Sequence, residues 1–185
     1  EKGDTVFIPD QDTAPIDPFC SLPALSMPGN AMVLDYPENR PLAQYPRNII
    51  KAAVEQMKAS GVADTMFILP EFEFYLFDDV TWEVSGREIS STVDAVQSYW
   101  NSGIEGHGVV VPKQKNYHIA KPFDISYECR SEMCMHMKDA GIDINYHHPE
   151  VAASGQLEIE PQLGEVVHMA DATMMIKYII PNTAL

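Results

Sequence analysis

The sequence predicts an α+β fold, and three observations support that prediction. Helical and strand patterns alternate irregularly along the chain, unlike the regular order of a doubly wound parallel sheet. Two strand patterns alternate acidic with apolar residues, the two-residue period of a strand whose faces differ. Hydrophobic residues make up 45% of the 185 residues, which is enough to fill a core.

The first third of the chain is expected to hold two short strands and a helix. Strands are predicted at residues 4–9 and 31–34, joined by a Pro- and Asp-rich connector from Asp10 to about Pro28. Residues 46–61 read as a helix, because proline opens the first turn, apolar residues recur at helical spacing, and glycine stands at the end.

The next pattern, over residues 66–77, is that of a buried strand carrying two glutamates. One face is expected to carry Glu71, Glu73 and Tyr75, and the other face Phe72, Phe74 and Leu76. Glutamate is unfavourable in strands, and a buried carboxylate must be paired, protonated or bound to a metal. The two neighbouring glutamates therefore predict that something positive lies between them.

After an excursion over residues 82–115, in which one hairpin is expected, the sequence returns to regular elements. A helix is predicted over residues 124–141, with Asp124 as its N-cap and a four-residue stripe of Ile125, Cys129, Met133 and Met137. Arg130 on this helix is expected to pair with a nearby carboxylate. Strands follow at residues 143–146 and 156–160. A third helix is expected from about Glu165, with an apolar side of Val166, Met169, Ala170, Thr173, Met174 and Ile176.

The strand at residues 156–160 repeats the acidic alternation, since Gln156, Glu158 and Glu160 alternate with Leu157 and Ile159. Glu150 precedes a turn of small residues that can bring it back beside this strand. If both acidic strands share a sheet, four carboxylates can converge: Glu71, Glu73, Glu150 and Glu158. Such a set of hard oxygen ligands suits Mg²⁺ or Mn²⁺ better than zinc.

The alternative for either strand alone is an ordinary solvated acidic face. His147 and His148 are open to two interpretations as well, either as metal ligands or as a turn whose rings pack locally. Met133, Met135 and Met137 are interpreted as core and helix surface rather than as a soft-metal site.

Composition excludes two classes of partner. The formal charge is −15, with 12 Lys and Arg against 27 Asp and Glu, so the chain should repel nucleic acid and anionic lipid. An anionic substrate would need divalent cations to neutralise the site.

The three cysteines show no zinc or redox spacing, which favours reduced thiols in a cytoplasmic protein. No apolar run is long enough to predict a membrane span. The chain begins at Glu1 and stops in an apolar run at Leu185, so we expect a piece of a larger protein.

Taken together, the segments resemble glutamine synthetase of the bacterial type. The most specific matches are P-E-F-E-F at residues 70–74 and H-H-P-E-V-A-A-S-G-Q-L-E at residues 147–158. Further matches run in the same order over nearly the whole chain, at residues 7–10, 16–19, 46–47, 61–65, 76–78, 100–101, 117, 130–133, 169–171 and 177–178.

The resemblance implies a role for each candidate site residue. Glu71 matches the glutamate that holds the metal on the ATP phosphates, and the other metal would be held by Glu73, Glu150 and Glu158. Tyr117 matches a tyrosine near the ammonium pocket, which Glu150 also borders, so these two are the catalytic candidates.

The sequence departs from the family pattern near the nucleotide. Asn145 stands where the bacterial enzymes commonly carry a glutamate, and it is the candidate for a nucleotide contact. Leu163 replaces an aromatic residue, and residues 116–118 read Asn-Tyr-His in place of Gly-Tyr-Phe. These differences are compatible with a divergent branch of the family.

The fold implied by the resemblance is an antiparallel sheet with flanking helices. Residues 1–30 would be the end of the N-terminal β-grasp domain, and residues 31–185 the first half of the catalytic domain. The implied reaction is ATP-dependent, with two Mg²⁺ or Mn²⁺ ions in each site. ATP phosphorylates the γ-carboxylate of glutamate, and ammonia then displaces the phosphate. Homo-oligomeric rings are expected for the complete enzyme, and the chain by itself is expected to be inactive.

Two alternatives remain at this stage. One is a γ-glutamyl-amine ligase of the same family, whose pocket around Tyr117 and Glu150 would admit an alkyl group. The other is a non-catalytic relative whose carboxylates form a structural ion site.

Overall fold

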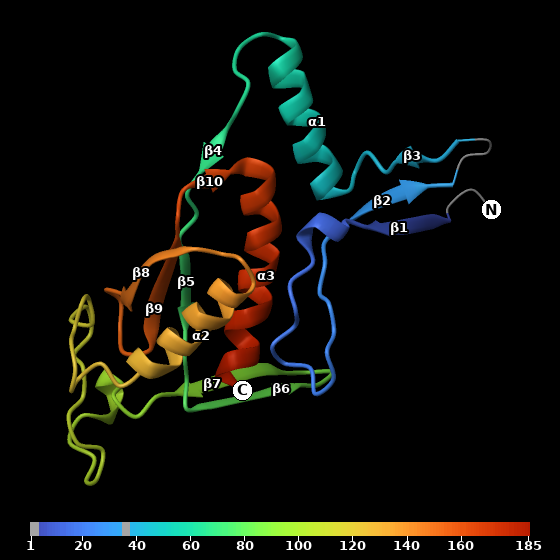
Figure 1. The fold of residues 1–185 in the computed structure, drawn as a ribbon. Helices are drawn as coiled ribbons and strands as arrows, with labels where there is room; N and C mark the ends of the chain where they lie inside the picture. The colour runs from blue at the N-terminus through green and yellow to red at the C-terminus, as the bar shows by residue number, and fades with distance from the viewer. Residues whose placement is uncertain (1–3, 35–37) are drawn as a thin grey trace.

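The computed structural model describes residues 4–34 and 38–185, which form three α-helices and several small antiparallel sheets (Figure 1). The helices are α1 (Pro46–Ala59), α2 (Tyr127–Asp139) and α3 (Val166–Ala184). Two 3₁₀ turns, η1 and η2, cover Gln11–Thr13 and Tyr99–Asn101. The strands are β1 (Thr5–Pro9), β2 (Gly29–Val33), β3 (Arg40–Pro41), β4 (Phe67–Ile68), β5 (Phe72–Tyr75), β6 (Asp79–Val84), β7 (Ile89–Asp94), β8 (Ile144–Pro149), β9 (Gln156–Pro161) and β10 (Gly164–Glu165). The predicted α+β class is confirmed.

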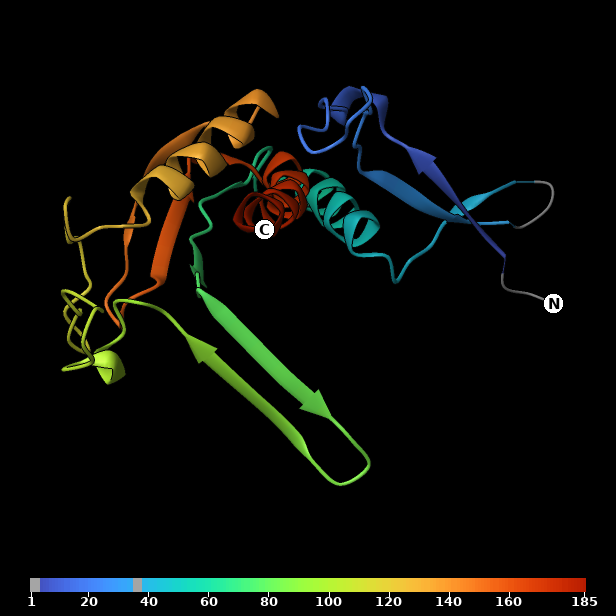
Figure 2. The same cartoon turned by 90° about the horizontal axis from the view of Figure 1, so that it is seen from below.

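The N-terminal part is a three-stranded antiparallel sheet in the order β1-β2-β3, which lies to one side of the molecule (Figures 1 and 2). Arg47 on α1 ties this sheet to α3. Its guanidinium donates to Asp10 at 2.6 Å, to Asn30 at 2.7 Å and to both carboxylate oxygens of Asp171 at 2.8 Å. One arginine thus joins the N-terminal segment and two helices.

The central sheet has the order β5-β9-β8, and both pairings are antiparallel. The apolar core connects this sheet with α2 and α3, and its buried members are Met133, Met137, Ile142, Ile159, Met169, Ala172, Ile176 and Ile179. The side chains that β5 contributes to this core are Phe72, Phe74 and, just beyond the strand, Leu76. Because neighbouring residues of a strand point to opposite faces, the acidic residues of β5 and β9 lie on the face away from the core.

The predicted buried strand over residues 66–77 is wrong in two respects. The chain forms β4 and β5 as separate strands, and β4 pairs with β10 rather than with β9. Glu71 and Glu73 are exposed, and so are Met66 and Phe67. The expected alternation is confirmed, since Glu71, Glu73 and Tyr75 are exposed while the aromatic and leucine side chains between them pack on the core.

The expected hairpin is formed by β6 and β7, which pair from Asp79–Asp94 to Val84–Ile89. It projects away from the helices (Figure 2), and all six residues of β6 are exposed. The rest of the excursion to residue 115 is largely without regular structure, apart from η2.

Two details of the predicted helices need correction. The N-cap of α2 is Ser126 rather than Asp124, and Ile125 is exposed because it lies before the helix. Asp124 instead accepts two hydrogen bonds from Arg130, at 2.6 and 3.0 Å, which confirms the structural partner expected for that arginine. On α3 the buried stripe is Val166, Met169, Ala172, Ile176 and Ile179, and Met174 is exposed. The start of α3 is as expected, with the Glu165 carboxylate accepting hydrogen bonds from two backbone N–H groups of the first turn.

The structure bears out the reading of the methionines, because Met133 and Met137 are fully buried in the core while Met135 is exposed. Among the described residues, no helix combines the length and the apolar character needed to cross a membrane.

Candidate metal centre

The sheet register places two glutamates and a histidine from three neighbouring strands side by side. Glu158, in the middle strand β9, pairs with Glu73 on β5 and with His148 on β8. Directly paired residues of an antiparallel sheet point to the same face, so these three side chains gather on the face opposite the core. The next residue of β9 on this face, Glu160, pairs with Tyr146.

Glu150 reaches the same place through a tight turn between β8 and β9. Its backbone N–H donates to the Gln156 carbonyl at 2.8 Å, which closes the turn. Gly155 adopts φ +88°, and a Cβ atom there would lie 2.5 Å from the Leu76 carbonyl oxygen. Only glycine fits this close approach without strain. The turn of small residues brings Glu150 back beside β9 as expected, and it needs glycine at position 155 because a side chain there would collide with the Leu76 backbone.

Gln156 connects the turn to the first acidic strand. Its side-chain amide donates to Glu73 at 2.8 Å, and its amide oxygen accepts from the Ala152 backbone N–H at 2.7 Å. The Glu73 carboxylate is therefore oriented by a group on the neighbouring strand.

Burial differs sharply among the carboxylates. Glu150, Glu158 and Glu160 are only 5–8% exposed, whereas Glu71 and Glu73 are exposed. The interpretation of residues 156–160 as a solvated acidic face is therefore wrong. The buried carboxylates lie on β9 and in the turn before it, whereas the exposed carboxylates lie on β5 and directly before it.

The electrostatic consequence is clearest at Glu158. Burial raises the pKa of this carboxyl from 4.5 to about 7, supported by a hydrogen bond with Glu150 and by the charges of Glu71, Glu150 and Glu73. A hydrogen bond between two carboxyl groups requires a proton on one of them. Without a cation, the site thus keeps a proton at a pH where an ordinary glutamate has lost it.

Two sets of ligand atoms are close enough to share an ion. One atom each of His148, Glu150 and Glu158 lie within 4.8 Å of one another, and so do oxygens of Glu71, Glu158 and Glu160. The His148 ring nitrogens lie 3.5 Å from Glu150 and 3.6 Å from Glu158. A set dominated by carboxylate oxygens fits Mg²⁺ or Mn²⁺, so the residues present suit the cations that the resemblance implies.

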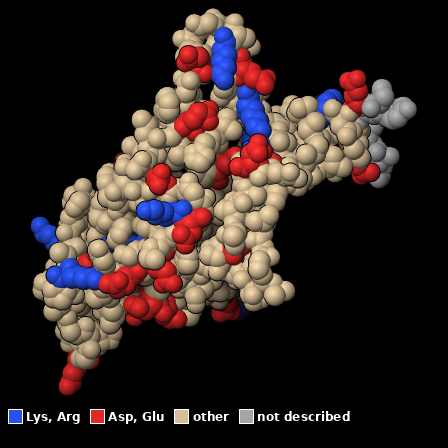
Figure 3. Space-filling model, in the orientation of Figure 1, with Lys and Arg blue, Asp and Glu red and all other residues tan. Residues whose placement is uncertain are grey.

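Four of the described arginines and lysines form ion pairs away from these carboxylates. Arg47 and Lys51 pair with Asp10, Arg130 with Asp124, and Lys121 with Glu128. The space-filling view shows acidic side chains spread over the visible face and fewer basic ones (Figure 3). In the described part of the chain, the metal candidates therefore have no arginine or lysine as a recorded partner.

The remaining candidates lie around this centre in different ways. Tyr117 is 57% exposed, and its ring lies 5.5 Å from that of His148, so it sits next to the carboxylates. His118 stacks on the same histidine at 4.1 Å. Asn145 donates to Glu160 at 3.1 Å, and Leu163 is exposed.

One contributor was not among the predicted candidates. Glu160 supplies an oxygen to a ligand group, although it was not among the four converging carboxylates. The signal for Glu160 was present, because it alternates with Glu158 on the same strand face. His148, which the sequence left open as a metal ligand or part of a packed turn, supplies a nitrogen to the other group, and this depends on the register of β8.

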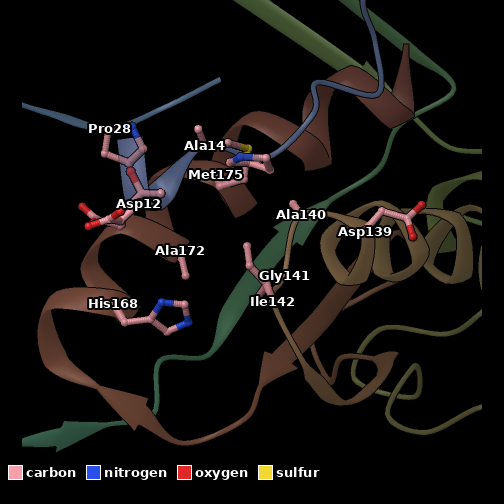
Figure 4. A pocket seen from close by; sticks show the side chains of 13 residues that line it. Asp12, Ala14, Pro28, Asp139, Ala140, Gly141, Ile142, His168, Ala172 and Met175 are labelled. Carbon is pink, nitrogen blue, oxygen red and sulfur yellow. The ribbon is translucent and has the colours of Figure 1, made fainter. Parts of the chain in front are cut away.

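Two cavities lie elsewhere in the molecule. The first, of about 390 Å³, is bordered by Asp12 of η1, by residues 139–142 at the end of α2, and by His168 and Ala172 of α3 (Figure 4). The second, of about 660 Å³, lies between the N-terminal segment, α1 and α3. No carboxylate of the candidate centre lines either cavity.

The chain is similar to several known proteins. Residues 43–185 match the family model described as glutamine synthetase, catalytic domain. A glutamine synthetase of Haemophilus influenzae is 35% identical over 188 residues, covering 100% of this chain and 39% of that protein. A 3-hydroxylaminophenol mutase of Cupriavidus pinatubonensis is 36% identical over 188 residues, covering 100% of this chain and 40% of that protein.

Among solved structures, a cryo-EM glutamine synthetase of Plasmodium falciparum matches with a TM-score of 0.81 and 24% identity. The match covers 97% of this chain and 36% of the Plasmodium chain, and at that identity it supports the fold alone. The chain spans about 39% of the length of the curated glutamine synthetases that it matches. By its match to the catalytic-domain model over residues 43–185, the chain belongs to the glutamine synthetase family.

Proposed function

We propose that this chain is part of an ATP-dependent glutamate–ammonia ligase, which forms glutamine through a γ-glutamyl phosphate intermediate. The observation that carries the proposal is the gathering of buried carboxylates around Glu158 without an arginine or lysine partner in the described residues. A buried charge of this kind is costly unless a cation or a proton neutralises it. A cation-dependent reaction on anionic substrates explains why such a site would be kept.

In the proposed site, two Mg²⁺ or Mn²⁺ ions are held by different carboxylates. Glu71 would hold the cation on the ATP phosphates, and the cation near the substrate glutamate would be held by Glu73, Glu150 and Glu158. When bound, the cations would neutralise carboxylate and phosphate and stabilise the charge that develops on the transferred phosphoryl group.

The chain's own residues would orient the reactants. Gln156 fixes one carboxylate oxygen of Glu73 at 2.8 Å, and the backbone N–H of Val151 fixes one oxygen of Glu150 at 2.8 Å. Preorganised groups of this kind need little rearrangement during the reaction. Glu150 and Tyr117 would border the ammonium pocket, and Asn145 would lie on the nucleotide side.

The activity is proposed for a protein that contains this chain, because the chain spans about 39% of its matched relatives. We propose that residues 1–30 end a β-grasp domain and that residues 31–185 begin the catalytic domain. ATP, glutamate and ammonia would be the substrates, homo-oligomeric rings the assembly, and the cytoplasm the location. The chain alone would be inactive, because it would supply only part of the phosphate-binding site.

A second candidate activity follows from the comparisons. The relative named 3-hydroxylaminophenol mutase is as similar to the chain as the glutamine synthetases are, at 36% against 35% identity. A γ-glutamyl-amine ligase is the third candidate, since Tyr117 is 57% exposed and leaves room at the rim for a larger amine.

Phosphate release by the protein containing this chain separates the candidates. The proposed ligase should release phosphate from ATP only with glutamate and ammonia, and much more slowly when methylamine or ethanolamine replaces ammonia. A preference for an amine would favour the γ-glutamyl-amine ligase. Rearrangement of 3-hydroxylaminophenol without phosphate release would instead favour the mutase and contradict the ligase.

A further inference from the structure

A group of aromatic rings lies beside the candidate metal centre, on the segment before α2. His118 stacks on His148, with ring centroids 4.1 Å apart and an interplanar angle of 30°. The Tyr117 ring meets His148 nearly edge-on, at 5.5 Å and 79°, and lies 4.3 Å from the His118 ring. The face of His118 that turns away from His148 and the ring of Tyr117 therefore form an aromatic corner, a name used here for these two residues.

The aromatic corner is open to solvent. Tyr117 is 57% exposed, and His118 is exposed as well. Rings that pack only to stabilise a fold bury their faces, because burial of apolar area is the source of that stabilisation. The two exposed rings of the corner are therefore available to stack with the ring of a ligand.

Two hydrogen bonds fix the segment that carries the corner onto β8, β9 and the turn between them. The backbone N–H of His118 donates to the Pro149 carbonyl at 3.1 Å. The side chain of Asn116, which is only 2% exposed, donates to the Gln156 carbonyl at 2.9 Å. The corner is therefore held at a fixed place relative to Glu150, which directly follows β8.

The backbone of His118 is a second observation at the same place. Its φ is +53°, in the left-handed region that residues other than glycine adopt uncommonly. Strain of this kind persists where the surrounding structure holds it, and it occurs often at ligand sites. The strained residue is also the one whose exposed ring face forms half of the corner.

The carboxylates next to the corner favour a ligand that also carries a positive charge. Glu150 is 8% exposed, and one of its oxygens lies 3.5 Å from Nδ1 of His148. A ring stacked on the outer face of His118 would lie farther from this carboxylate than the His148 ring does. An amino group must then be carried on a short carbon linker to reach the carboxylate. The geometry thus favours an arylalkyl ammonium over an amine whose nitrogen is attached directly to the ring.

We propose that the aromatic corner of Tyr117 and His118 binds the ring of an arylalkyl primary amine, which serves as a nitrogen donor alongside ammonia. The inference rests on the proposed function, because the amine takes the place of ammonia in the same ligase reaction. The ammonium group loses one proton to solvent, and its nitrogen forms a bond to the γ-carbonyl carbon of γ-glutamyl phosphate. The bond from that carbon to the phosphate oxygen breaks, phosphate leaves with the electron pair, and the nitrogen releases a second proton as the amide forms.

Phosphate release by the protein that contains this chain, with ATP, glutamate and one amine at a time, tests the inference. Benzylamine and cyclohexylmethylamine share the same linker and differ little in size, but only benzylamine has an aromatic ring. Because ring pairs attract beyond their area burial, kcat/KM should be about fivefold or more higher for benzylamine. His118→Asn removes the ring and suits a left-handed backbone, so it should reduce this preference to about twofold or less. His168→Asn, at an exposed position of α3, should leave the preference unchanged.

The outcomes separate this inference from the proposed function. Phosphate release with ammonia, together with equal rates for the two amines or an unchanged preference in His118→Asn, would overturn the inference and leave the proposed function standing. Release with benzylamine but not with ammonia would support the inference and contradict the ammonia ligase. Release with no nitrogen donor would overturn both. Circular dichroism shows whether His118→Asn is folded; if it is not, Tyr117→Leu decides, with an unchanged preference for benzylamine counting against the inference.

Discussion

The molecule contains two kinds of buried charged cluster, and they differ in how the charge is balanced. Arg130 is 1% exposed and is bound by Asp124, Ser126 and His147, so a fixed guanidinium neutralises the buried aspartate. Around Glu158 the carboxylates have a shared proton, amides, a hydroxyl and the His148 imidazole as partners in the described residues, but no arginine or lysine. The balanced cluster can hold the fold without any ligand, whereas the unbalanced one has a strong electrostatic reason to bind a cation.

The two clusters should respond in opposite ways to the loss of a charge. Breaking a balanced buried pair leaves one charge uncompensated, and this is strongly destabilising. Removing charge from an unbalanced cluster relieves repulsion, so it should stabilise the metal-free protein and abolish cation binding.

The largest expected effect is the loss of Arg130. Arg130→Met would leave the Asp124 carboxylate buried without its partner, since its side chain is only 4% exposed. We expect the free energy of unfolding to fall by about 3–5 kcal/mol, measured by urea denaturation. The double variant Arg130→Met/Asp124→Asn should recover part of this loss. A loss below about 1 kcal/mol would show that the cluster is not structural.

The second effect is a pH dependence that originates at Glu158. Its pKa is raised in the folded state, so the native protein binds more protons than the unfolded chain between pH 4.5 and about 7. Stability should therefore fall as the pH rises through this window, by up to roughly 3 kcal/mol for the metal-free chain. Urea denaturation at pH 5 and pH 8 should show the fall in the wild type and a smaller one in Glu158→Gln. Equal pH dependence in both proteins would contradict this origin.

A smaller effect is expected at the turn that positions Glu150. Gly155→Ala would place a Cβ atom 2.5 Å from a backbone oxygen at φ +88°, whereas Gly141 at φ +81° has open space. We expect a loss of about 2 kcal/mol for Gly155→Ala and about 1 kcal/mol for the control Gly141→Ala. Weaker Mn²⁺ binding should accompany only the first. Equal losses, with unchanged Mn²⁺ binding, would show that the turn does not position the carboxylates.

The parts of the fold that depend on local pattern were predictable from the sequence. The alternation of acidic and apolar residues on β5 and β9, the proline-started α1 and the acidic start of α3 all follow from residue order and backbone geometry. The role of Asp124 could not be predicted in this way. An aspartate before a helix can be either its N-cap or the partner of an arginine, and the sequence does not distinguish the two.

For the candidate site, the sequence predicted that carboxylates gather, but it did not predict which of them are buried. Which of them are buried depends on strand order, and β9 lies between β5 and β8 for reasons of tertiary packing. For the same reason Glu160 was missed and the role of His148 was left open, because their contribution follows from the register of β8 against β9.

The most direct test of the central claim is calorimetric titration of the wild-type chain and of Glu73→Gln/Glu158→Gln with Mn²⁺ at pH 8. The wild type should bind Mn²⁺, and the double variant, still folded, should bind it at least a hundredfold more weakly. Binding of equal strength in both proteins, or in neither, would contradict the claim that these unbalanced carboxylates form a cation site.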